Sequence, residues 1–392
     1  MFSSRTSWNL NPNRLSQAIE RKRQAGVEFL DLTVSNPTGC GFRYDEAGIL
    51  AALSNPSSLE YDPAPGGLLQ ARRAVAEYYN STGARKTSTD DIVLTTSTSE
   101  GYSFLFRLLC NPGDEVLIPR PSYPLFDFLA TLDDVRLVPY SLVYDHGWQV
   151  DFHSVESAIT ARTKAVIVVH PNNPTGSYLK LHELAQWNEL CMKNKLAIIA
   201  DEVFLDYSLA DESFAQSQTA NEGALTFVLS GLSKICGLPQ MKVAWLVTNG
   251  PAAQKQEALA RLEVIADTYL SMNAPLQHAA PALLQLRADF QAQLKKRAKA
   301  NMAELDRQLA ANPTQACQRL EVEGGWSVIL KVPVTRTDED LAIELVDKHS
   351  VVVHPGHFFD FESDGYLVLS LITPQQQFKE GTRRILEAIA VR

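Results

Sequence analysis

Three short polar segments contain the residue types that can hold an aromatic aldehyde. They read NNPTG at 172–176, ADEVF at 200–204 and SGLSK at 230–234. Asn173 can donate a hydrogen bond to a phenolic ring oxygen, Asp201 can pair with a protonated ring nitrogen, and Lys234 can bond to a carbonyl carbon. Each also has an ordinary alternative, as a turn asparagine, a helix-capping aspartate or a surface lysine. Their occurrence together, in this order, favours one shared site.

The neighbours of Lys234 and Asp201 fit catalytic work. Lys234 follows an apolar run and has small neighbours, which let a flat molecule approach closely. A lysine attacks a carbonyl as the free amine, so burial or cationic neighbours must lower its pKa. Asp201 ends the apolar run LAIIA, which places it at the carboxyl edge of a sheet, where α/β proteins bind ligands. We predict that both residues are catalytic.

Two further segments can bind the other parts of such a molecule. STSEG at 97–101 follows a strand-like run and opens a helix, so its backbone N–H groups, with Thr98 and Ser99, can cradle a phosphate. A plain helix N-cap fits that segment equally well. Tyr123, in PRPSYP, lies just beyond another strand-like run and can stack on a flat ring, although a lone aromatic is more often a core residue.

The elements that must position these residues indicate an α/β fold. Between residues 90 and 250, β-branched runs alternate with amphipathic stretches, and several runs are apolar on both sides. This alternation predicts a large domain with a mostly parallel seven-stranded sheet flanked by helices. The strand candidates are 91–96, 115–119, 135–140, 165–170, 196–200, 226–230 and 243–248.

The remaining chain is expected to form a second, smaller α+β domain. Residues 252–311 have the pattern of long helices, interrupted at 271–275. A helix is expected near 337–349, and strands are expected at 326–333, 351–356 and 366–372. We predict an N-terminal segment, 1–45, that packs with the small domain, a large domain, 46–275, and a small C-terminal domain, 276–392.

Composition narrows the class of protein. A length of 392 residues favours two domains, and 45% hydrophobic with 21% charged residues is ordinary for a soluble globular chain. A net charge of −9 argues against nucleic acid or an anionic membrane as partner. The chain has neither an apolar run near the roughly 20 residues that cross a bilayer nor a signal-peptide core at its start. Five scattered cysteines, without a CxxC pair, predict a reducing cytoplasm and no metal site.

Further segments complete a family resemblance. With the three opening segments they cover nearly the whole chain, and they are SNPTG at 35–39, YDPAPGGLLQARRAVAEYY at 61–79, NPGDEVLIPRPSYP at 111–124 and VVVHPG at 351–356. The set resembles the class I/II aminotransferases, a family of fold-type-I pyridoxal-phosphate enzymes. The resemblance implies a cofactor, pyridoxal 5'-phosphate, held as a Schiff base on Lys234, which also moves protons. It implies transfer of an amino group between an amino donor and a 2-oxo acid.

The resemblance also assigns roles around the cofactor. Asp201 would pair with the ring nitrogen, Asn173 would contact the ring oxygen, and Tyr123 would stack on the ring. SNPTG at 35–39 would face the substrate.

Four residues are expected at the phosphate. Thr98 and Ser99 would bind it, and Lys242 stands where the family commonly has Arg, so the charge is kept but the bidentate fork is lost. Tyr61 would reach the phosphate of the neighbouring subunit, because the family's active sites lie at a homodimer interface.

One departure from the family pattern concerns Phe204. The family usually has Tyr there, whose hydroxyl donates to the ring oxygen and keeps the Schiff-base pKa low. We therefore predict a more basic Schiff base in this chain, unless Tyr207 supplies the missing hydroxyl.

A second departure concerns the substrate. The family's carboxylate-binding Arg lies two residues before a Ser in the last strand, where this chain has Val368. Either Arg120, Arg43 or Arg5 binds the carboxylate, or the substrate carries none at that place. His357 is a further substrate-facing candidate, although a plain loop histidine is the commoner case.

Two other functions fit the same cofactor. A β-elimination or C–S lyase would use the same lysine and cofactor to expel a substituent. A catalytically inert pyridoxal-phosphate-binding protein would explain the two departures as decay, but it has no need for Lys234 and Asp201.

Overall fold

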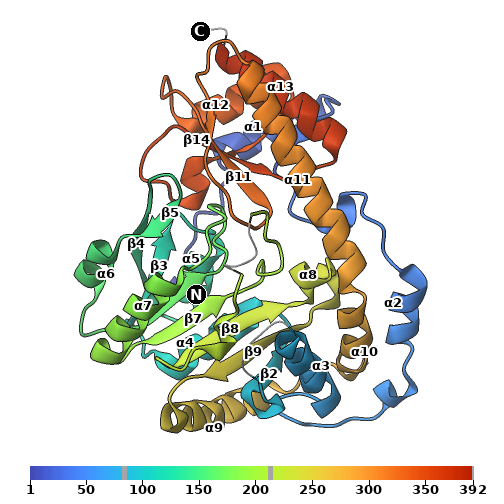
Figure 1. The fold of residues 1–392 in the computed structure, drawn as a ribbon, viewed down its shortest axis with the longest axis vertical. Coiled ribbons are helices and arrows are strands. Elements are labelled where there is room, and N and C mark those ends of the chain that lie inside the picture. The colour runs from blue at the N-terminus through green and yellow to red at the C-terminus, as the bar shows by residue number, and fades with distance from the viewer. Residues whose placement is uncertain (82–85, 211–214, 391–392) are drawn as a thin grey trace.

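The computed structural model describes residues 1–81, 86–210 and 215–390. Its large sheet has eight strands in the order β2-β9-β8-β7-β6-β3-β4-β5 (Figure 1). The central strands β8, β7, β6, β3 and β4 run parallel to one another, whereas β2, β9 and β5 pair antiparallel with their neighbours. The strands are β2 Ile92–Thr95, β3 Glu115–Arg120, β4 Arg136–Tyr144, β5 Trp148–Val150, β6 Thr163–Val169, β7 Ala197–Asp201, β8 Thr226–Gly231 and β9 Ala244–Asn249.

The predicted α/β class is confirmed, and all seven expected strands form. The sheet is nevertheless mixed and has one strand more than expected. The additional strand, β5, is three residues long and closes a hairpin with β4 across residues 145–147. So short a strand leaves little alternation in the sequence by which to detect it.

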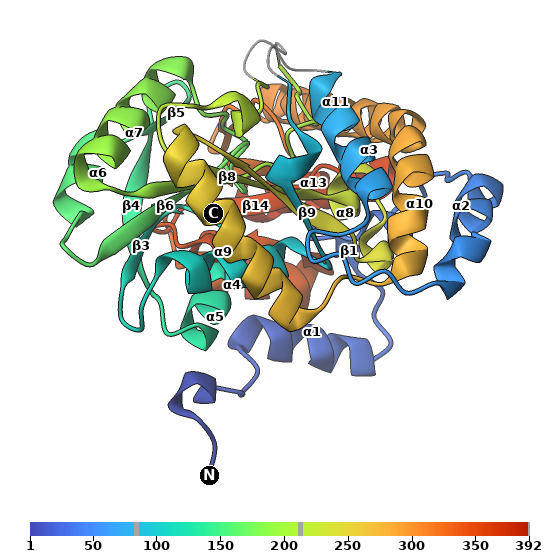
Figure 2. The same cartoon turned by 90° about the horizontal axis from the view of Figure 1, so that it is seen from below.

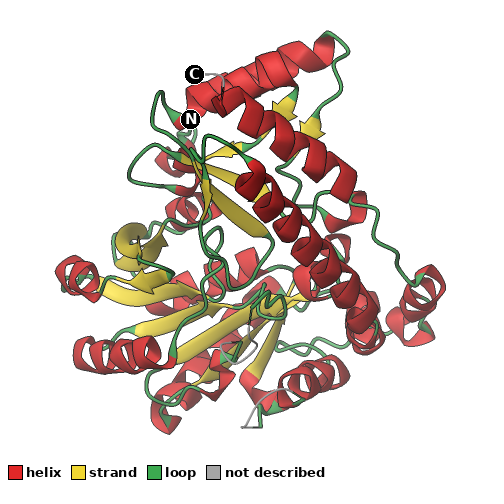
Figure 3. Ribbon diagram, turned by 45° about the horizontal axis from the view of Figure 1, so that its top comes forward, coloured by secondary structure: helices red, strands yellow, loops and turns green. Residues whose placement is uncertain are grey.

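Helices cover both faces of the large sheet, which explains why its strands are apolar on both sides (Figure 3). Ile167 and Ile199 pack with the helices of one face, and Val166 and Ile198 with those of the other. The first face carries α4 Thr98–Leu109, α5 Leu125–Leu132 and α9 Ala252–Tyr269. The second carries α3 Leu69–Asn80, α6 Phe152–Ala158, α7 Leu181–Asn194, α8 Leu232–Ile235 and α10 Ala274–Gln285.

A smaller α+β unit lies above the large sheet in Figure 1. Its four-stranded antiparallel sheet has the order β10-β11-β14-β13, and a separate parallel pair joins β1 to β12. The strands are β1 Leu30–Asp31, β10 Gln318–Arg319, β11 Ser327–Lys331, β12 Val351–Val352, β13 His354–Pro355 and β14 Tyr366–Ser370. The helices are α1 Arg14–Gln24, α12 Asp338–Glu344 and α13 Gln375–Ala390, with a π-helical turn at Leu345–His349.

The N-terminal segment contributes to the core of this smaller unit. Leu15 and Leu32 pack in one cluster with Leu345, Leu369 and Phe378. The residues ahead of α1 reach away from the body of the molecule in Figure 2, where α2, Glu46–Leu53, also lies at the periphery. The domain limits at 45/46 and 275/276 stay a prediction.

Helix α11, Arg287–Ala311, runs along both units (Figure 1). Near its start, Phe290 and Leu294 pack with aromatic residues of the large domain, while Ala298 and Leu305 belong to the core of the smaller unit. The same helix therefore links the two cores. In the described part of the chain, no helix combines the length and the apolar character that crossing a bilayer requires.

Candidate active site

The strand register brings the predicted site residues to one edge of the large sheet. Lys234 follows the end of β8, Asp201 ends β7, Asn173 follows the end of β6, and the N-terminus of α4 follows the end of β2. Lys242 precedes β9, which runs the opposite way and so begins at the same edge. The paired residues at this edge are Thr95 with Ala244, Ala244 with Gly231, Leu229 with Asp201 and Asp201 with Val169.

Asp201 is a buried carboxylate at the centre of this edge. It is 8% exposed and accepts hydrogen bonds from the Tyr102 hydroxyl at 2.9 Å and the Val203 N–H at 3.2 Å. Burial raises the pKa of Asp201, and the two hydrogen bonds and the charge of Lys234 act against that rise. The environment therefore favours a cationic partner for this carboxylate.

Tyr102 is a contributor that the sequence reasoning missed. It lies on α4, one helical turn after Thr98, and so points from the same face of the helix. That spacing was the available signal, but its partner, Asp201, is 99 residues away in the sequence.

Lys234 lies on α8, a helix of four residues directly after β8. Burial lowers its pKa to about 8, and the negative charge of Asp201 acts in the opposite direction. Its Nζ atom is 4.7 Å from the centroid of the Trp326 ring and 5.5 Å from that of Phe204. Because of the lowered pKa, a larger fraction of this amine is uncharged near neutral pH than for an ordinary lysine, as a nucleophile or base requires.

Tyr207 does not stand in for the hydroxyl that Phe204 lacks. It is fully buried, and its hydroxyl donates a hydrogen bond to the backbone carbonyl of Lys234. That hydroxyl therefore supports the backbone of the lysine and is not directed to a ring oxygen.

Asn173 lies in a well-ordered turn. The turn is closed by a hydrogen bond from the Gly176 N–H to the Asn172 carbonyl at 2.8 Å, and Thr175 Oγ1 donates to Asn172 Oδ1 at 3.0 Å. The Asn173 side chain is partly exposed, and its Oδ1 accepts from Ser327 Oγ at 3.3 Å. Since the amide oxygen is the acceptor in this pair, the amide N–H groups are the part of Asn173 that suits a ring oxygen.

The expected phosphate site is the start of α4. Ser97 caps the helix by accepting from the Glu100 N–H at 3.1 Å, and Thr98 and Ser99 follow it, partly exposed. First-turn N–H groups have no partner within the helix, so these two residues present free backbone donors to an anion. Lys242 is exposed, with a left-handed backbone (φ of 51°), and adds a positive charge near that edge.

The two predicted tyrosines are open to solvent. Tyr123 is 45% exposed and lines a cavity of about 150 Å³ together with Arg120. Tyr61 is 74% exposed. Its expected place at a neighbouring subunit's site stays a prediction.

The position of Val368 is a packed apolar site. Val368 is 2% exposed and clusters with Trp148, Ile329 and Phe359, which leaves no room there for a guanidinium group. This cluster explains how the chain accommodates the loss of the family's Arg.

The three alternative cations lie in different surroundings. Arg5 donates to the Leu132 carbonyl at 3.2 Å and pairs with an exposed aspartate on the outside of α5. Arg43 is exposed on the segment before α2. Arg120 ends β3 at the site edge, and its Nε is buried without a hydrogen-bond partner among the described residues. His357 is exposed and packs edge-on against Phe358.

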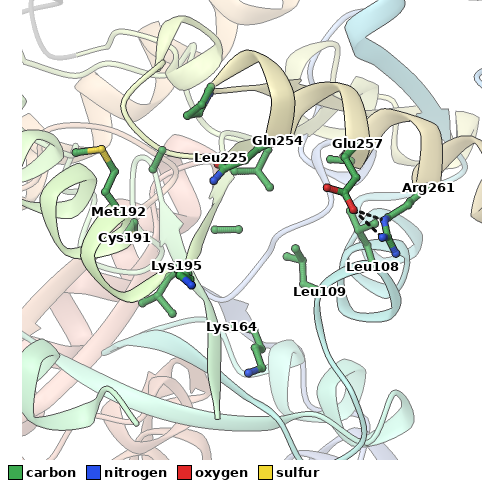
Figure 4. Close-up of a pocket in the computed structure, with 15 residues that line it drawn as sticks. Leu108, Leu109, Lys164, Cys191, Met192, Lys195, Leu225, Gln254, Glu257 and Arg261 are labelled. Carbon is green, nitrogen blue, oxygen red and sulfur yellow. Dashed lines mark hydrogen bonds and ion pairs between the residues drawn. The ribbon is translucent and has the colours of Figure 1, made fainter. Parts of the chain in front are cut away.

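A separate cavity of about 500 Å³ lies at the opposite edge of the sheet (Figure 4). It is bounded by Ala197, the first residue of β7, and by Leu225, just before β8, and Figure 4 draws Lys164, Lys195 and the Glu257–Arg261 ion pair around it. None of the predicted site residues lines it.

Comparison with known proteins identifies the family of the chain. Residues 27–385 match the model of the family described as aminotransferase class I and II. Glutamate-pyruvate aminotransferase AlaA of Haemophilus influenzae is 32% identical over 261 residues, which make up 66% of this chain and 64% of that protein. The match thus spans just under two thirds of that relative's length.

A second sequence relative and a solved structure are also similar to this chain. S-alkyl-thiohydroximate lyase SUR1 of Arabidopsis thaliana is 27% identical over 320 residues, 79% of this chain and 69% of that protein. The structure of an alanine aminotransferase from Pyrococcus furiosus has a TM-score of 0.90 at 22% identity, covering 100% of both chains, and so shares the fold. By its sequence match from residue 27 to residue 385, this chain belongs to the class I and II aminotransferase family.

Proposed function

We propose that the protein is a pyridoxal-phosphate-dependent aminotransferase, which moves an amino group between an amino donor and a 2-oxo acid. The observation that carries the proposal is the meeting of Lys234, Asp201, Asn173 and the N-terminus of α4 at one sheet edge. This edge offers a reactive amine for a carbonyl carbon, an anion for a ring nitrogen, an amide for a ring oxygen and backbone donors for a phosphate. One flat cofactor carries all four of these groups.

The residues fit that cofactor. Asp201 is a buried carboxylate with a raised pKa, so a protonated ring nitrogen would supply the cation that it lacks. Asn173 suits the ring oxygen, Thr98 and Ser99 with Lys242 suit the phosphate, and Tyr123 suits one face of the ring. When bound, pyridoxal phosphate supplies an electrophilic carbon and a ring that withdraws electrons from it.

The chain's own residues perform the proton chemistry. Lys234 has its pKa lowered to about 8, so near neutral pH its Nζ can bond to a carbonyl carbon and, once released, accept and return a proton. Asp201 would pair with the ring nitrogen, and the Tyr102 hydroxyl, which donates to Asp201, holds the orientation of that carboxylate.

The half-reaction tests this function. Purified protein loaded with pyridoxal phosphate is mixed with L-alanine or L-glutamate alone, and we expect stoichiometric conversion of the cofactor to pyridoxamine phosphate. Lys234→Ala should lose the visible absorbance of the bound cofactor. Lys164→Ala, at the opposite edge of the sheet, should keep it. No amine-dependent spectral change with any donor in a broad panel would instead favour the inert binding protein.

A C–S or β-elimination lyase is the second candidate. The similarity to the plant lyase favours it. Release of ammonia and pyruvate from cysteine-like substrates, without accumulation of pyridoxamine phosphate, would identify this reaction. The donor panel should include amines without an α-carboxylate, because the Val368 site is filled by apolar side chains.

We also propose a homodimer with shared active sites. Tyr61 lies among exposed apolar residues of the segment from α2 to α3, and the exposed fractions are 64% for Leu50, 93% for Leu59 and 49% for Leu69. Such a surface is of the kind that association covers. A cytoplasmic location is proposed from the five free thiols.

A further inference from the structure

We propose that Trp326 is a positioning residue for the reacting amine, and that its ring, together with that of Phe204, holds Lys234 Nζ in place. The inference rests on the proposed function for its catalytic meaning, but the contact itself can be tested without turnover. Trp326 belongs to none of the segments that carry the chemistry in the sequence.

Two aromatic rings, those of Trp326 and Phe204, lie close to the amine. Lys234 Nζ lies 4.7 Å from the Trp326 ring centroid and 5.5 Å from that of Phe204, and the two rings meet edge to face with centroids 5.2 Å apart. Both distances lie within the roughly 6 Å over which a ring face attracts a cation. The rings therefore favour the charged amine at this place and keep it from swinging away.

Trp326 is itself immobilised by its neighbours. It is 5% exposed, and Tyr207 packs edge-on against it with centroids 5.2 Å apart. Its carbonyl accepts from the Leu371 N–H at 2.8 Å, and the preceding residue, Gly325, donates to the Tyr207 carbonyl at 2.9 Å. Tyr207 in turn donates its hydroxyl to the Lys234 carbonyl. One residue thus supports both the tryptophan and the lysine.

The residues just before Trp326 are hydrogen-bonded to the large domain, although β11, which follows Trp326, belongs to the smaller unit. The Gly324 N–H donates to the Gly176 carbonyl at 2.9 Å, and the Leu209 N–H donates to the Glu323 carbonyl at 2.8 Å. The Glu323 side chain accepts from the Tyr178 N–H at 2.8 Å and pairs with Lys180. These bonds set the height of the Trp326 ring above the sheet edge where Lys234 lies.

A ring face suits this amine better than a fixed acceptor would. A hydrogen-bonded oxygen would occupy a direction that the amine needs when it reacts, whereas the attraction to a ring is broad in direction. Phe204 lacks the hydroxyl that the family usually has at its position, so this residue offers the amine no hydrogen-bond acceptor. The Trp326 and Phe204 faces supply the orienting contact.

Of the other ionisable groups near the site, three stay uncharged over the useful range, whereas burial raises the pKa of Glu202, next to Asp201, to about 8, so that it titrates in the same range as Lys234. Burial raises the pKa of Tyr44 to about 12 and raises the pKa values of Tyr207 and Cys236 as well, so all three stay neutral near pH 8. Asp201 is the carboxylate whose charge acts on Lys234. Glu202 is unchanged in every variant, so a difference in the Lys234 midpoint between variants reports the residue at position 326.

The first test compares Trp326→Phe with Trp326→Leu in the full-length protein. Both variants leave cavities of similar size, but only phenylalanine keeps a ring face. The pH midpoint of Lys234 reactivity is measured with trace acetic anhydride and mass spectrometry of the Lys234 peptide. We expect the leucine variant to have a midpoint about 0.3–1 pH unit below that of the phenylalanine variant. Equal midpoints would mean that Trp326 fills space and would overturn the proposal.

A second test avoids any change of volume. The chain has five tryptophans, and fluorinated tryptophan incorporated at all of them weakens the attraction of each ring face for a cation. We expect the Lys234 midpoint to fall with each added fluorine in the native chain. The same incorporation in Trp326→Phe serves as control and should leave the midpoint unchanged. A shift in both proteins, or in neither, contradicts the assignment.

The outcome is independent of the proposed reaction. Labelling reads Lys234 in protein without cofactor or substrate, so a failed half-reaction would not alter it. Conversely, if the half-reaction succeeds but the Lys234 midpoint does not depend on the residue at 326, the proposed function stands and the role of Trp326 is refuted.

Discussion

Two adjacent acidic residues, Asp201 at the end of β7 and Glu202 directly after it, have different environments. Asp201 turns to Tyr102 at the site edge. Glu202 is 1% exposed and accepts hydrogen bonds from Ser217 Oγ at 2.7 Å and from the Gln218 N–H. Burial, which these hydrogen bonds oppose, raises the pKa of Glu202 from 4.5 to about 8. Near neutral pH this carboxyl is therefore largely protonated.

That raised pKa predicts a pH dependence of stability. Between pH 4.5 and about 8 the unfolded chain has lost the Glu202 proton while the folded chain keeps it, so the free energy of unfolding falls as pH rises. The slope from one group is at most about 1.4 kcal/mol per pH unit. We expect Glu202→Gln to reduce this decline in urea unfolding of cofactor-free protein at pH 5 to 8. Identical slopes in the two proteins would contradict the expectation.

Phe204 yields a prediction for the loaded protein. Introducing a hydroxyl by Phe204→Tyr places a donor beside the ring oxygen, which stabilises the deprotonated form of the lysine–cofactor bond. We expect the pH midpoint of the cofactor's visible absorbance to move to lower pH. Phe204→Leu is the control, since it changes size without adding a donor. A clearly acidic midpoint in the unaltered protein would refute the view that Phe204 makes this group more basic.

At the scale of elements, the strand pattern carried most of the information. The apolar runs predicted seven strands of the large sheet, the interruption at 271–275 predicted the break between α9 and α10, and both form. The ends of these strands also identified where Asp201, Asn173 and Lys234 would meet. Local patterns suffice for such features because burial on both faces requires a continuous apolar run.

Contacts between segments far apart in the chain could not be predicted from the sequence alone. Trp326 lies 92 positions after Lys234, and nothing in its own segment, GGWSVIL, marks it as a neighbour of the lysine. Tyr207 had a candidate role through its position after ADEVF, but its hydroxyl points to the Lys234 backbone. Such pairings depend on how the smaller unit settles on the large sheet, which local periodicity does not encode.

The turn at Gly176 provides a prediction at this scale. Gly176 has φ of +70°, and an added Cβ would lie 2.5 Å from the Gly324 carbonyl oxygen. Gly113 has φ of +84° but nothing within 4 Å of such an atom. Both alanine variants share the left-handed strain, so their difference reports the crowding. We expect Gly176→Ala to lower the free energy of unfolding by about 1–3 kcal/mol more than Gly113→Ala, measured by urea unfolding. Equal losses of unfolding free energy would mean that the backbone at Gly324 moves aside for the added methyl group without destabilising the protein.

At the scale of the whole molecule, the two units are joined at separated places. Helix α11 links their cores, and residues 322–327 bind to the loops that follow β6 and β7. The exposed apolar segment from α2 to α3 lies at the edge of the molecule, and its start, α2, is beside α10 and the lower part of α11 (Figure 1). The proposed contact with a second copy would use this segment, while the chain's own two units are already connected.

Mixed dimers test the sharing of sites between copies. If Tyr61 serves the partner's phosphate, a dimer of one Lys234→Ala subunit and one Tyr61→Phe subunit contains one complete site. We expect the pure Tyr61→Phe dimer to bind pyridoxal phosphate more weakly, and a co-expressed mixture to regain tight sites at up to one per mixed dimer. Spectral titration against light-scattering mass gives the stoichiometry. A monomeric mass, or no recovery in the mixture, would exclude a role for Tyr61 across subunits.

The attachment of residues 323–327 beside Lys234 also has a consequence for the order of events during synthesis. When Asp201, Asn173 and Lys234 have all been synthesised, the ring that lies over the amine is still 92 residues from being made. A nascent chain that ends before Trp326 would thus present its lysine more openly to water. We expect firm cofactor capture to begin after the last third of the chain has emerged, which makes bound cofactor a reporter of completed translation.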